Sequence, residues 1–225
     1  MKLFISADIE GCVGTTLASE THKETPEYRQ FAKRMTDEVR IVCQAALEAG
    51  ADEIVVKDGH GDATNIDFTA MPEGVTLIRG KSGHPYNMMF GLDETFDGVL
   101  YVGYHAPAGN GGNPISHTST GNSNQILLNG KVMSEFMLNT YTAAMMGVPA
   151  VFISGDEARE MVPGITTAAV KKGVGACTIN MSVAAADRLL KEKVKEALSG
   201  DLKACRIAMP EQFEYVVNYK DLKKA

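Results

Sequence analysis

The chain has 225 residues, a length that suits one large domain or two small ones. Its net charge is −6 and its basic residues form no cluster, so we expect no nucleic-acid partner. The sequence has no apolar run long enough to span a membrane and no leader-like segment, and its four cysteines form no C-x-x-C pair. We therefore expect a cytoplasmic protein with reduced thiols and no contact with a membrane.

The first third of the chain has the pattern of a strand–helix–strand unit. Residues 2–8 form a short apolar run typical of a buried strand. Apolar residues then recur every three or four positions up to Gly50, which predicts a helix that begins at Pro26 with Thr25 as its cap. Residues 52–58 predict a second buried strand, so the order indicates a parallel pair with a right-handed crossover.

Further along, short apolar runs predict more strands, and a long polar loop occupies residues 107–124. The additional strands are expected at residues 75–80, 98–105, 149–156 and 212–219. Residues 125–133 predict a hairpin with Asn129-Gly130 as its turn. Two more helices are predicted at 134–147 with Ser134 as cap and at 181–200 with Ser182 as cap. A short helix is expected directly after the strand that ends at residue 156.

This alternation of elements predicts an α/β fold: an open, mostly parallel sheet with helices on both faces, plus a smaller α/β second part. We expect residues 1–130 to form the metal-binding α/β domain and residues 131–225 to form the second part. In open α/β sheets, ligands bind beyond the carboxyl ends of the strands, near the switch in strand order. The residues at the strand ends are therefore the candidates for function.

Side chains that can bind metal follow three of the predicted strands. These strands end in Asp8 and Glu10, in Asp58 and His60, and in Tyr104 and His105. If the strands are parallel, all of these side chains point into one crevice. Because side chains alternate along a strand, Asp8 and Glu10 share a face, where two carboxylates repel each other unless a cation is present.

Two carboxylates and two imidazoles form a ligand set that suits zinc or another borderline metal such as manganese or cobalt. Glu135, at the start of the helix capped by Ser134, can add a further carboxylate. Five ligands with one bridging carboxylate would hold two metal ions about 3.5–4 Å apart. Each feature also has a structural interpretation, because an acidic pair at a strand end can be a solvated edge and a histidine there can be hydrogen-bonded framework.

His117 lies in the long polar loop, and two interpretations of it remain open. A loop of that length is either functional or disordered. His117 is accordingly an acid–base group or electrostatic stabiliser, or else an exposed histidine in a mobile loop. His22 and His84 lie in polar segments and at most line a pocket. The motifs of nucleotide-binding loops, serine hydrolases and HExxH peptidases do not occur.

The sequence resembles the DppA-type D-aminopeptidases, zinc-dependent peptidases that are also called dipeptide-transport proteins. Their S-x-D-x-E-G signature reads SADIEG here, at residues 6–11. Further matching segments follow in order: DGH at 58–60, GYHA at 103–106, SH at 116–117, NGKV-x-x-E ending at Glu135, and TTAAVK at 166–171. The resemblance covers nearly the whole chain, although members of the family usually continue past the point where this chain ends.

The resemblance implies a function for each of the candidate residues. The family's metal ligands fall on Asp8, Glu10, His60, His105 and Glu135, which would hold two zinc ions per chain. Asp8 would be the bridging carboxylate, and the family's catalytic loop residue falls on His117. The resemblance also implies a homodecamer of two stacked pentameric rings, with active sites that face an inner channel.

The expected function is therefore that of a zinc-dependent metallopeptidase of the D-aminopeptidase type. It would hydrolyse short peptides with an N-terminal D-amino acid through a metal-bound water at a two-zinc site. One alternative is a two-metal phosphoesterase, for which Arg79 and Lys81 are the nearest candidates to clamp a phosphate. Another alternative is a non-catalytic, ring-forming protein that binds peptides.

Overall fold

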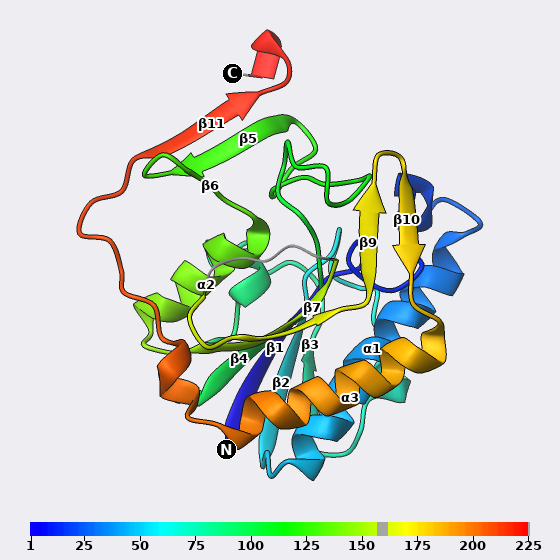
Figure 1. Ribbon diagram of the computed structural model, residues 1–225, viewed down its shortest axis with the longest axis vertical. Coiled ribbons are helices and arrows are strands. Elements are labelled where there is room, and N and C mark those ends of the chain that lie inside the picture. Colours follow the sequence, from blue (N-terminus) through cyan, green and yellow to red (C-terminus); the bar gives the residue numbers. More distant parts are fainter. Residues whose placement is uncertain (157–161, 225) are drawn as a thin grey trace.

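The computed structural model of the protein describes residues 1–156 and 162–224. Its main feature is a six-stranded sheet in which all neighbouring strands are parallel (Figure 1). In spatial order the strands are β3 (Val75–Ile78), β2 (Glu53–Asp58), β1 (Lys2–Ala7), β4 (Gly98–Tyr104), β7 (Ala150–Gly155) and β8 (Thr166–Ala169). The chain builds outwards from β1 in one direction and from β4 in the other, so the strand order switches between β1 and β4.

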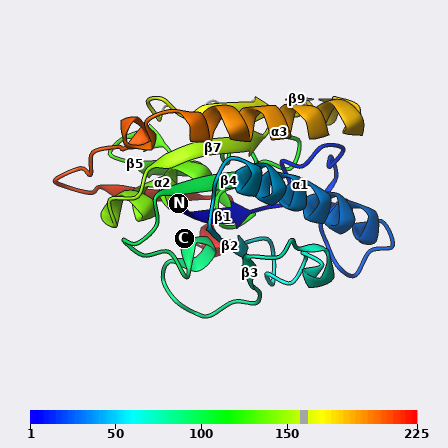
Figure 2. The same ribbon diagram turned by 90° about the horizontal axis from the view of Figure 1, so that it is seen from below.

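Helices cover both faces of this sheet, as predicted. α1 (Tyr28–Glu48) and α3 (Val183–Ser199) pack side by side on one face, and α2 (Glu135–Met145) packs on the other (Figure 2). Successive side chains of β1 point to opposite faces of the sheet and so contribute to two hydrophobic cores. Ile5 belongs to the core under α1 and α3, whereas its neighbour Phe4 belongs to the core under α2. The predicted α/β fold class is confirmed.

Two small antiparallel sheets accompany the main sheet (Figure 1). One is the hairpin of β9 (Lys171–Val174) and β10 (Cys177–Asn180), and the other pairs β5 (Ser123–Leu128) with β6 (Lys131–Val132) and with β11 (Tyr215–Tyr219). The turn between β5 and β6 is Asn129-Gly130, with φ angles of 51° and 74° that fit a type I′ turn. The predicted hairpin is therefore confirmed.

The predicted caps are correct for two of the three helices. Ser134 and Ser182 each accept a hydrogen bond from the backbone amide three residues later, at the starts of α2 and α3. The predicted start of α1 is wrong, because this helix begins at Tyr28 and not at Pro26. The hydroxyl of Thr25 donates 2.6 Å to a carbonyl oxygen of the preceding turn, so it does not cap the helix.

Short 3-10 helices lie in the connections, at Ala18–Glu20, Phe68–Ala70, Asn87–Met89, Leu202–Cys205 and Leu222–Lys224. The short helix predicted directly after β7 lies outside the described residues. Strands from both sides of residue 130 share the main sheet, and the division of the chain into 1–130 and 131–225 stays a prediction. Within the described ranges, no helix has both the length and the apolar content to cross a bilayer.

Candidate metal centre

A cavity of about 490 Å³ opens at the edge of the main sheet where β1, β2 and β4 end. Five of the six predicted site residues line this cavity: Asp8, Glu10, His60, His117 and Glu135. The sixth, His105, has a side chain that is only 1% exposed, and its ring stacks on that of His117 with ring centres 4.4 Å apart. The structure therefore brings all six residues together at the switch in strand order, where open α/β sheets bind ligands.

Asp8 and Glu10 lie on the tight turn after β1 and not on the strand itself. The strand ends at Ala7, and the amide of Gly11 donates a 2.7 Å hydrogen bond to the carbonyl oxygen of Gly103 in β4. This turn, and not alternation along a strand, is the reason that both carboxylates reach the cavity. Their side chains are only 3% and 4% exposed, so two acidic groups lie buried side by side.

His60 is held so that one ring nitrogen faces the two carboxylates. Its Nε2 lies 2.9 Å from the carbonyl oxygen of Thr21, and its Nδ1 lies 3.0 Å from Glu10 Oε1 and 3.4 Å from Asp8 Oδ1. A carbonyl oxygen only accepts hydrogen bonds, so it favours a hydrogen on Nε2. This leaves Nδ1 available as a ligand, as is usual for histidines that bind metal.

His105 has the reverse arrangement. Its Nδ1 lies 2.9 Å from the carbonyl oxygen of Ala106, and its Nε2 lies 3.6 Å from Asp8 Oδ2 and 3.9 Å from Glu135 Oε1. Asp8 therefore presents one oxygen to His60 and its other oxygen to His105. A carboxylate that faces two imidazoles in this way is suited to bridge two cations.

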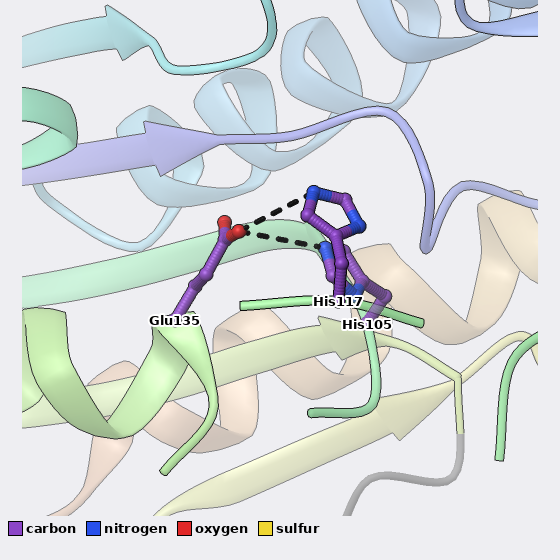
Figure 3. Close-up of side chains that lie close together, drawn as sticks. All are labelled: His105, His117 and Glu135. Carbon is purple, nitrogen blue, oxygen red and sulfur yellow. Dashed lines mark ion pairs between the residues drawn. The ribbon is translucent and has the colours of Figure 1, made fainter. Parts of the chain in front are cut away.

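His117 and Glu135 complete the group, and the stacked rings of His105 and His117 both face the carboxylate of Glu135 (Figure 3). His117 Nδ1 lies 3.0 Å from the carbonyl oxygen of Ile115, and its Nε2 lies 3.5 Å from Glu135 Oε1. The backbone amide of Ser119 donates 2.8 Å to the same Glu135 oxygen. The long loop thus folds back onto the start of α2, and His117 is not an exposed residue remote from the other candidates.

The electrostatics of the group follow from burial and from the pairing of acids with imidazoles. Burial, together with the charge of Glu10, raises the pKa of Asp8. Burial would also raise the pKa of Glu10, but His60 outweighs that effect and lowers it. Burial alone would lower the pKa of His60, whereas Glu10 and Asp8 raise it to about 11. For His105, the acidic neighbours likewise outweigh burial and raise its pKa to about 9.

The donor set fits a bound metal ion. Two buried atoms of the group, Glu10 Oε2 and His105 Nε2, have no hydrogen-bond partner. Such buried polar atoms are costly unless something binds them, and a cation would satisfy both. Two overlapping sets of possible ligands lie within 4.8 Å of one another: Asp8, Glu10 and His105, and His105, His117 and Glu135. Mixed carboxylate and imidazole ligands are those that zinc prefers.

Asp58 and Tyr104, which the strand-end pattern also placed in the crevice, have structural roles instead. Asp58 accepts hydrogen bonds from the backbone amides of Asn65 and Ile66 at 2.6 and 2.8 Å, and so shapes the loop after His60. The hydroxyl of Tyr104 lies 2.7 Å from the hydroxyl of Ser6 inside the core. Both side chains therefore support the site from outside the cavity.

Polar residues that the sequence did not single out hold the loops of the site together. Asp156 Oδ2 accepts hydrogen bonds from the amide of Ala106 and from the side chain of Asn113, both at 3.0 Å. The same Asn113 nitrogen lies 3.0 Å from the carbonyl oxygen of Glu10. These contacts join the ends of β7, β4 and β1. They connect residues far apart in the chain, so no sequence motif predicts them.

The rim of the cavity carries two further residues of interest, Lys81 and Lys220, together with His22. Lys81 was a candidate to clamp the phosphate of a phosphoesterase substrate, and it does line the cavity. Arg79, the second candidate, donates 3.2 Å to the carbonyl oxygen of Thr64 instead. Lys220 lies just after β11, and its position in the site has no counterpart in the sequence pattern.

Comparison with known proteins gives one consistent result. The model of the D-aminopeptidase family (Peptidase_M55) matches residues 1–225. A D-aminopeptidase of Bacillus subtilis (strain 168) is 33% identical over 218 residues, which cover 94% of this chain and 79% of the relative. A solved structure, described as the Zn-dependent D-aminopeptidase DppA from Bacillus subtilis, a self-compartmentalizing protease, superposes with a TM-score of 0.93 at 30% identity. That match covers 98% of this chain and 82% of the other.

Proposed function

This chain belongs to the D-aminopeptidase family, and from that membership and the geometry of the site we propose that it is a zinc-dependent aminopeptidase. Its substrates are short peptides with an N-terminal D-amino acid. The observation that carries the proposal is the set of three histidines, each paired with a backbone carbonyl so that its other nitrogen faces buried carboxylates. Such an arrangement prepares imidazoles to bind a metal ion.

Five residues are proposed as zinc ligands: Asp8, Glu10, His60, His105 and Glu135. All five side chains are largely buried, which suits groups that bind a cation and not bulk water. Two zinc ions per chain are proposed, because the two oxygens of Asp8 face different imidazoles. Asp8 would then be the carboxylate that bridges them.

His117 is proposed as the catalytic residue and not as a sixth ligand. Its side chain is 25% exposed, whereas the five proposed ligands are 12% exposed or less. It lines the cavity from the long loop, where a substrate can contact it. The interaction of its Nδ1 with Ile115 directs Nε2 towards Glu135 and the centre of the site.

Different groups at the site have different roles in the proposed hydrolysis. Bound zinc supplies Lewis-acid chemistry, which lowers the pKa of water and polarises a carbonyl group. The free amino end of a peptide would bind beside the metal centre at the floor of the cavity, which would orient the peptide bond. His117 Nε2 moves a proton or stabilises negative charge on the carbonyl oxygen as the peptide bond breaks.

Assembly and location are proposed on separate grounds. We expect a homodecamer of two pentameric rings, which is supported by the self-compartmentalizing nature of the structural relative. Exposed apolar side chains on the β9–β10 hairpin and on β11 offer surface for such contacts; they are Val174, Ile179, Tyr215 and Tyr219. A cytoplasmic location is supported by the four cysteines, which are all free thiols.

The test combines metal content with turnover. Untagged protein is analysed for zinc and assayed with D-alanyl-D-alanine, L-alanyl-L-alanine and p-nitrophenyl phosphate. Close to two zinc ions per chain with turnover of the D-peptide alone is the expected result. Metal with turnover of the phosphate ester alone would favour a two-metal phosphoesterase. Protein without metal or turnover would favour a non-catalytic peptide-binding role.

A further inference from the structure

The cavity has the candidate metal-binding residues at its floor and two lysines at its rim. The carboxylates of Asp8, Glu10 and Glu135 form the floor, and each of these side chains is at most 8% exposed. The lysines in the lining are Lys81 and Lys220, and both are exposed. Among the described residues, no other carboxylate and no arginine lines the cavity.

The two lysines reach the cavity from segments far apart in the sequence, and the backbone of each is anchored. The amide of Lys220 donates 2.9 Å to the carbonyl oxygen of Asn122, next to β5. Gly80, the residue before Lys81, donates 2.6 Å to the carbonyl oxygen of Ala63 and accepts 2.9 Å from the ammonium group of Lys57. The backbone from which each lysine side chain starts is therefore held in place.

Neither ammonium group has an acidic partner. Within residues 1–156 and 162–224, no ion pair joins Lys81 or Lys220 to a carboxylate. Exposed lysines often lie unpaired, so one such residue alone would carry no meaning. Two unpaired ammonium groups on the rim of the cavity that also holds the candidate metal centre form a positive patch, which attracts the anionic end of a molecule bound there.

We propose that Lys81 and Lys220 form a subsite for the C-terminal carboxylate of a short peptide, an inference that rests on the proposed aminopeptidase function. A free peptide has an ammonium group at one end and a carboxylate at the other. When its amino end is at the metal centre on the floor, a peptide of two or three residues extends about 7–11 Å towards the rim, since each residue spans about 3.3–3.6 Å. A cavity of about 490 Å³ accommodates a ligand of that size.

The subsite selects short free peptides over longer or blocked ones. A longer chain carries its carboxylate past the two ammonium groups, and an amidated chain has no negative charge for them to bind. The lysines thereby select for peptide length by binding the terminal carboxylate, and not by steric exclusion of longer chains. They are binding residues and take no part in the proton transfers.

The test compares D-alanyl-D-alanine with its C-terminal amide on the zinc-loaded protein. The wild type is expected to prefer the free acid by about tenfold in kcat/KM, as two charge-assisted contacts at a partly exposed site imply. In the double variant Lys81→Met with Lys220→Met, the ratio of the two kcat/KM values falls to near one. Lys131→Met removes an exposed lysine on β6, outside the cavity, and is expected to keep the wild-type ratio.

Binding without turnover separates this inference from the proposed function. The probe is D-alanyl-D-alanine with a reduced, uncleavable peptide bond, as free acid and as amide, in titration calorimetry with the zinc-loaded protein. Tighter binding of the acid, lost in the double variant, supports the subsite even if no peptide is hydrolysed. Equal binding of acid and amide by the wild type, or a preference that persists in the double variant, would overturn it.

Discussion

The buried ammonium group of Lys171 donates a hydrogen bond to the backbone carbonyl oxygen of Glu10, although 161 positions separate the two residues in the sequence. The same group bonds to the carbonyl oxygen of Thr15, and the side-chain amide of Asn113 donates 3.0 Å to the Glu10 carbonyl. Lys171 is only 3% exposed, so its bonds form where the dielectric is low and charge-assisted bonds are strong. The turn that carries Asp8 and Glu10 is thus held by side chains from two distant segments.

Lys171→Met is expected to weaken zinc binding by about 10- to 100-fold, the usual effect of losing a group that positions a metal ligand. Methionine keeps much of the side-chain volume and removes both donated hydrogen bonds. Zinc affinity is measured by competition with a chromophoric chelator, with circular dichroism as the check on folding. Lys203→Met, at an exposed lysine outside the cavity, is the control.

If Lys171→Met does not fold, Asn113→Ala removes the other donor to the same carbonyl oxygen and tests the same idea. A folded variant of either kind with wild-type zinc affinity would show that the Glu10 turn holds its position without these bonds.

Glu10→Gln is expected to leave the fold intact, to abolish stable zinc binding and to lower kcat/KM by at least about 100-fold. Glutamine has almost the same shape but no negative charge, and its amide oxygen is a poor ligand for zinc. Two measurements are made: the zinc content of the dialysed protein by elemental analysis, and the rate at which the protein hydrolyses D-alanyl-D-alanine. Glu24→Gln changes an exposed acid outside the cavity in the same way and should retain both properties. Full zinc content in Glu10→Gln would remove Glu10 from the ligand set.

Zinc binding is expected to release protons from His60 and His105. Although burial favours the neutral ring, the acidic neighbours raise the pKa of His60 to about 11 and that of His105 to about 9. Both rings are therefore protonated at pH 7 in the metal-free protein, and both must lose a proton to bind zinc. About two protons per chain should be released below pH 9, and zinc affinity should rise steeply with pH up to about 9 and less steeply from there to about 11, where only His60 still has to lose its proton.

Calorimetric titration with zinc in buffers of different ionisation enthalpy counts the released protons. His60→Ala should release about one proton fewer than the wild type. A binding heat that does not depend on the buffer would mean that the imidazoles are already neutral, or that they do not bind the metal.

The edge of the sheet that holds the site could be predicted from the sequence, because the carboxyl ends of parallel strands meet at one edge whatever the details of the loops. Asp8, Glu10, His60 and His105 follow directly from that rule. The same rule also selected Asp58, wrongly, since it does not show whether a carboxylate faces the cavity or accepts hydrogen bonds from its own loop.

The return of the long loop to the site could not be predicted from the sequence. His117 lies beside Glu135 because the amide of Ser119 donates to that carboxylate and because the hydroxyl of Thr118 donates 2.9 Å to the carbonyl oxygen of Met133. Bonds of this kind involve no periodic pattern and no motif. The same holds for Lys220, which reaches the cavity only because β11 pairs with β5.

Gly11→Ala is expected to destabilise the protein and to disrupt the metal centre together. A Cβ atom at residue 11 would lie 2.0 Å from the carbonyl oxygen of Tyr104, so the turn after β1 would have to move away from the end of β4. That movement breaks the 2.7 Å bond from Gly11 to Gly103 and separates Glu10 from His105. We expect a loss of about 1–3 kcal/mol in the free energy of unfolding, as for other overpacked sites.

Gly111→Ala is the matched control, because a Cβ atom at residue 111 has no heavy atom within 4 Å. Urea unfolding of both metal-free variants gives the stability change, and chelator competition gives the zinc affinity. Gly11→Ala should lower both the free energy of unfolding and the zinc affinity, whereas Gly111→Ala should change neither. A Gly11→Ala variant that is less stable but binds zinc normally would mean that the two loops can separate without moving the ligands. The close contact between β1 and β4 would then serve the fold alone.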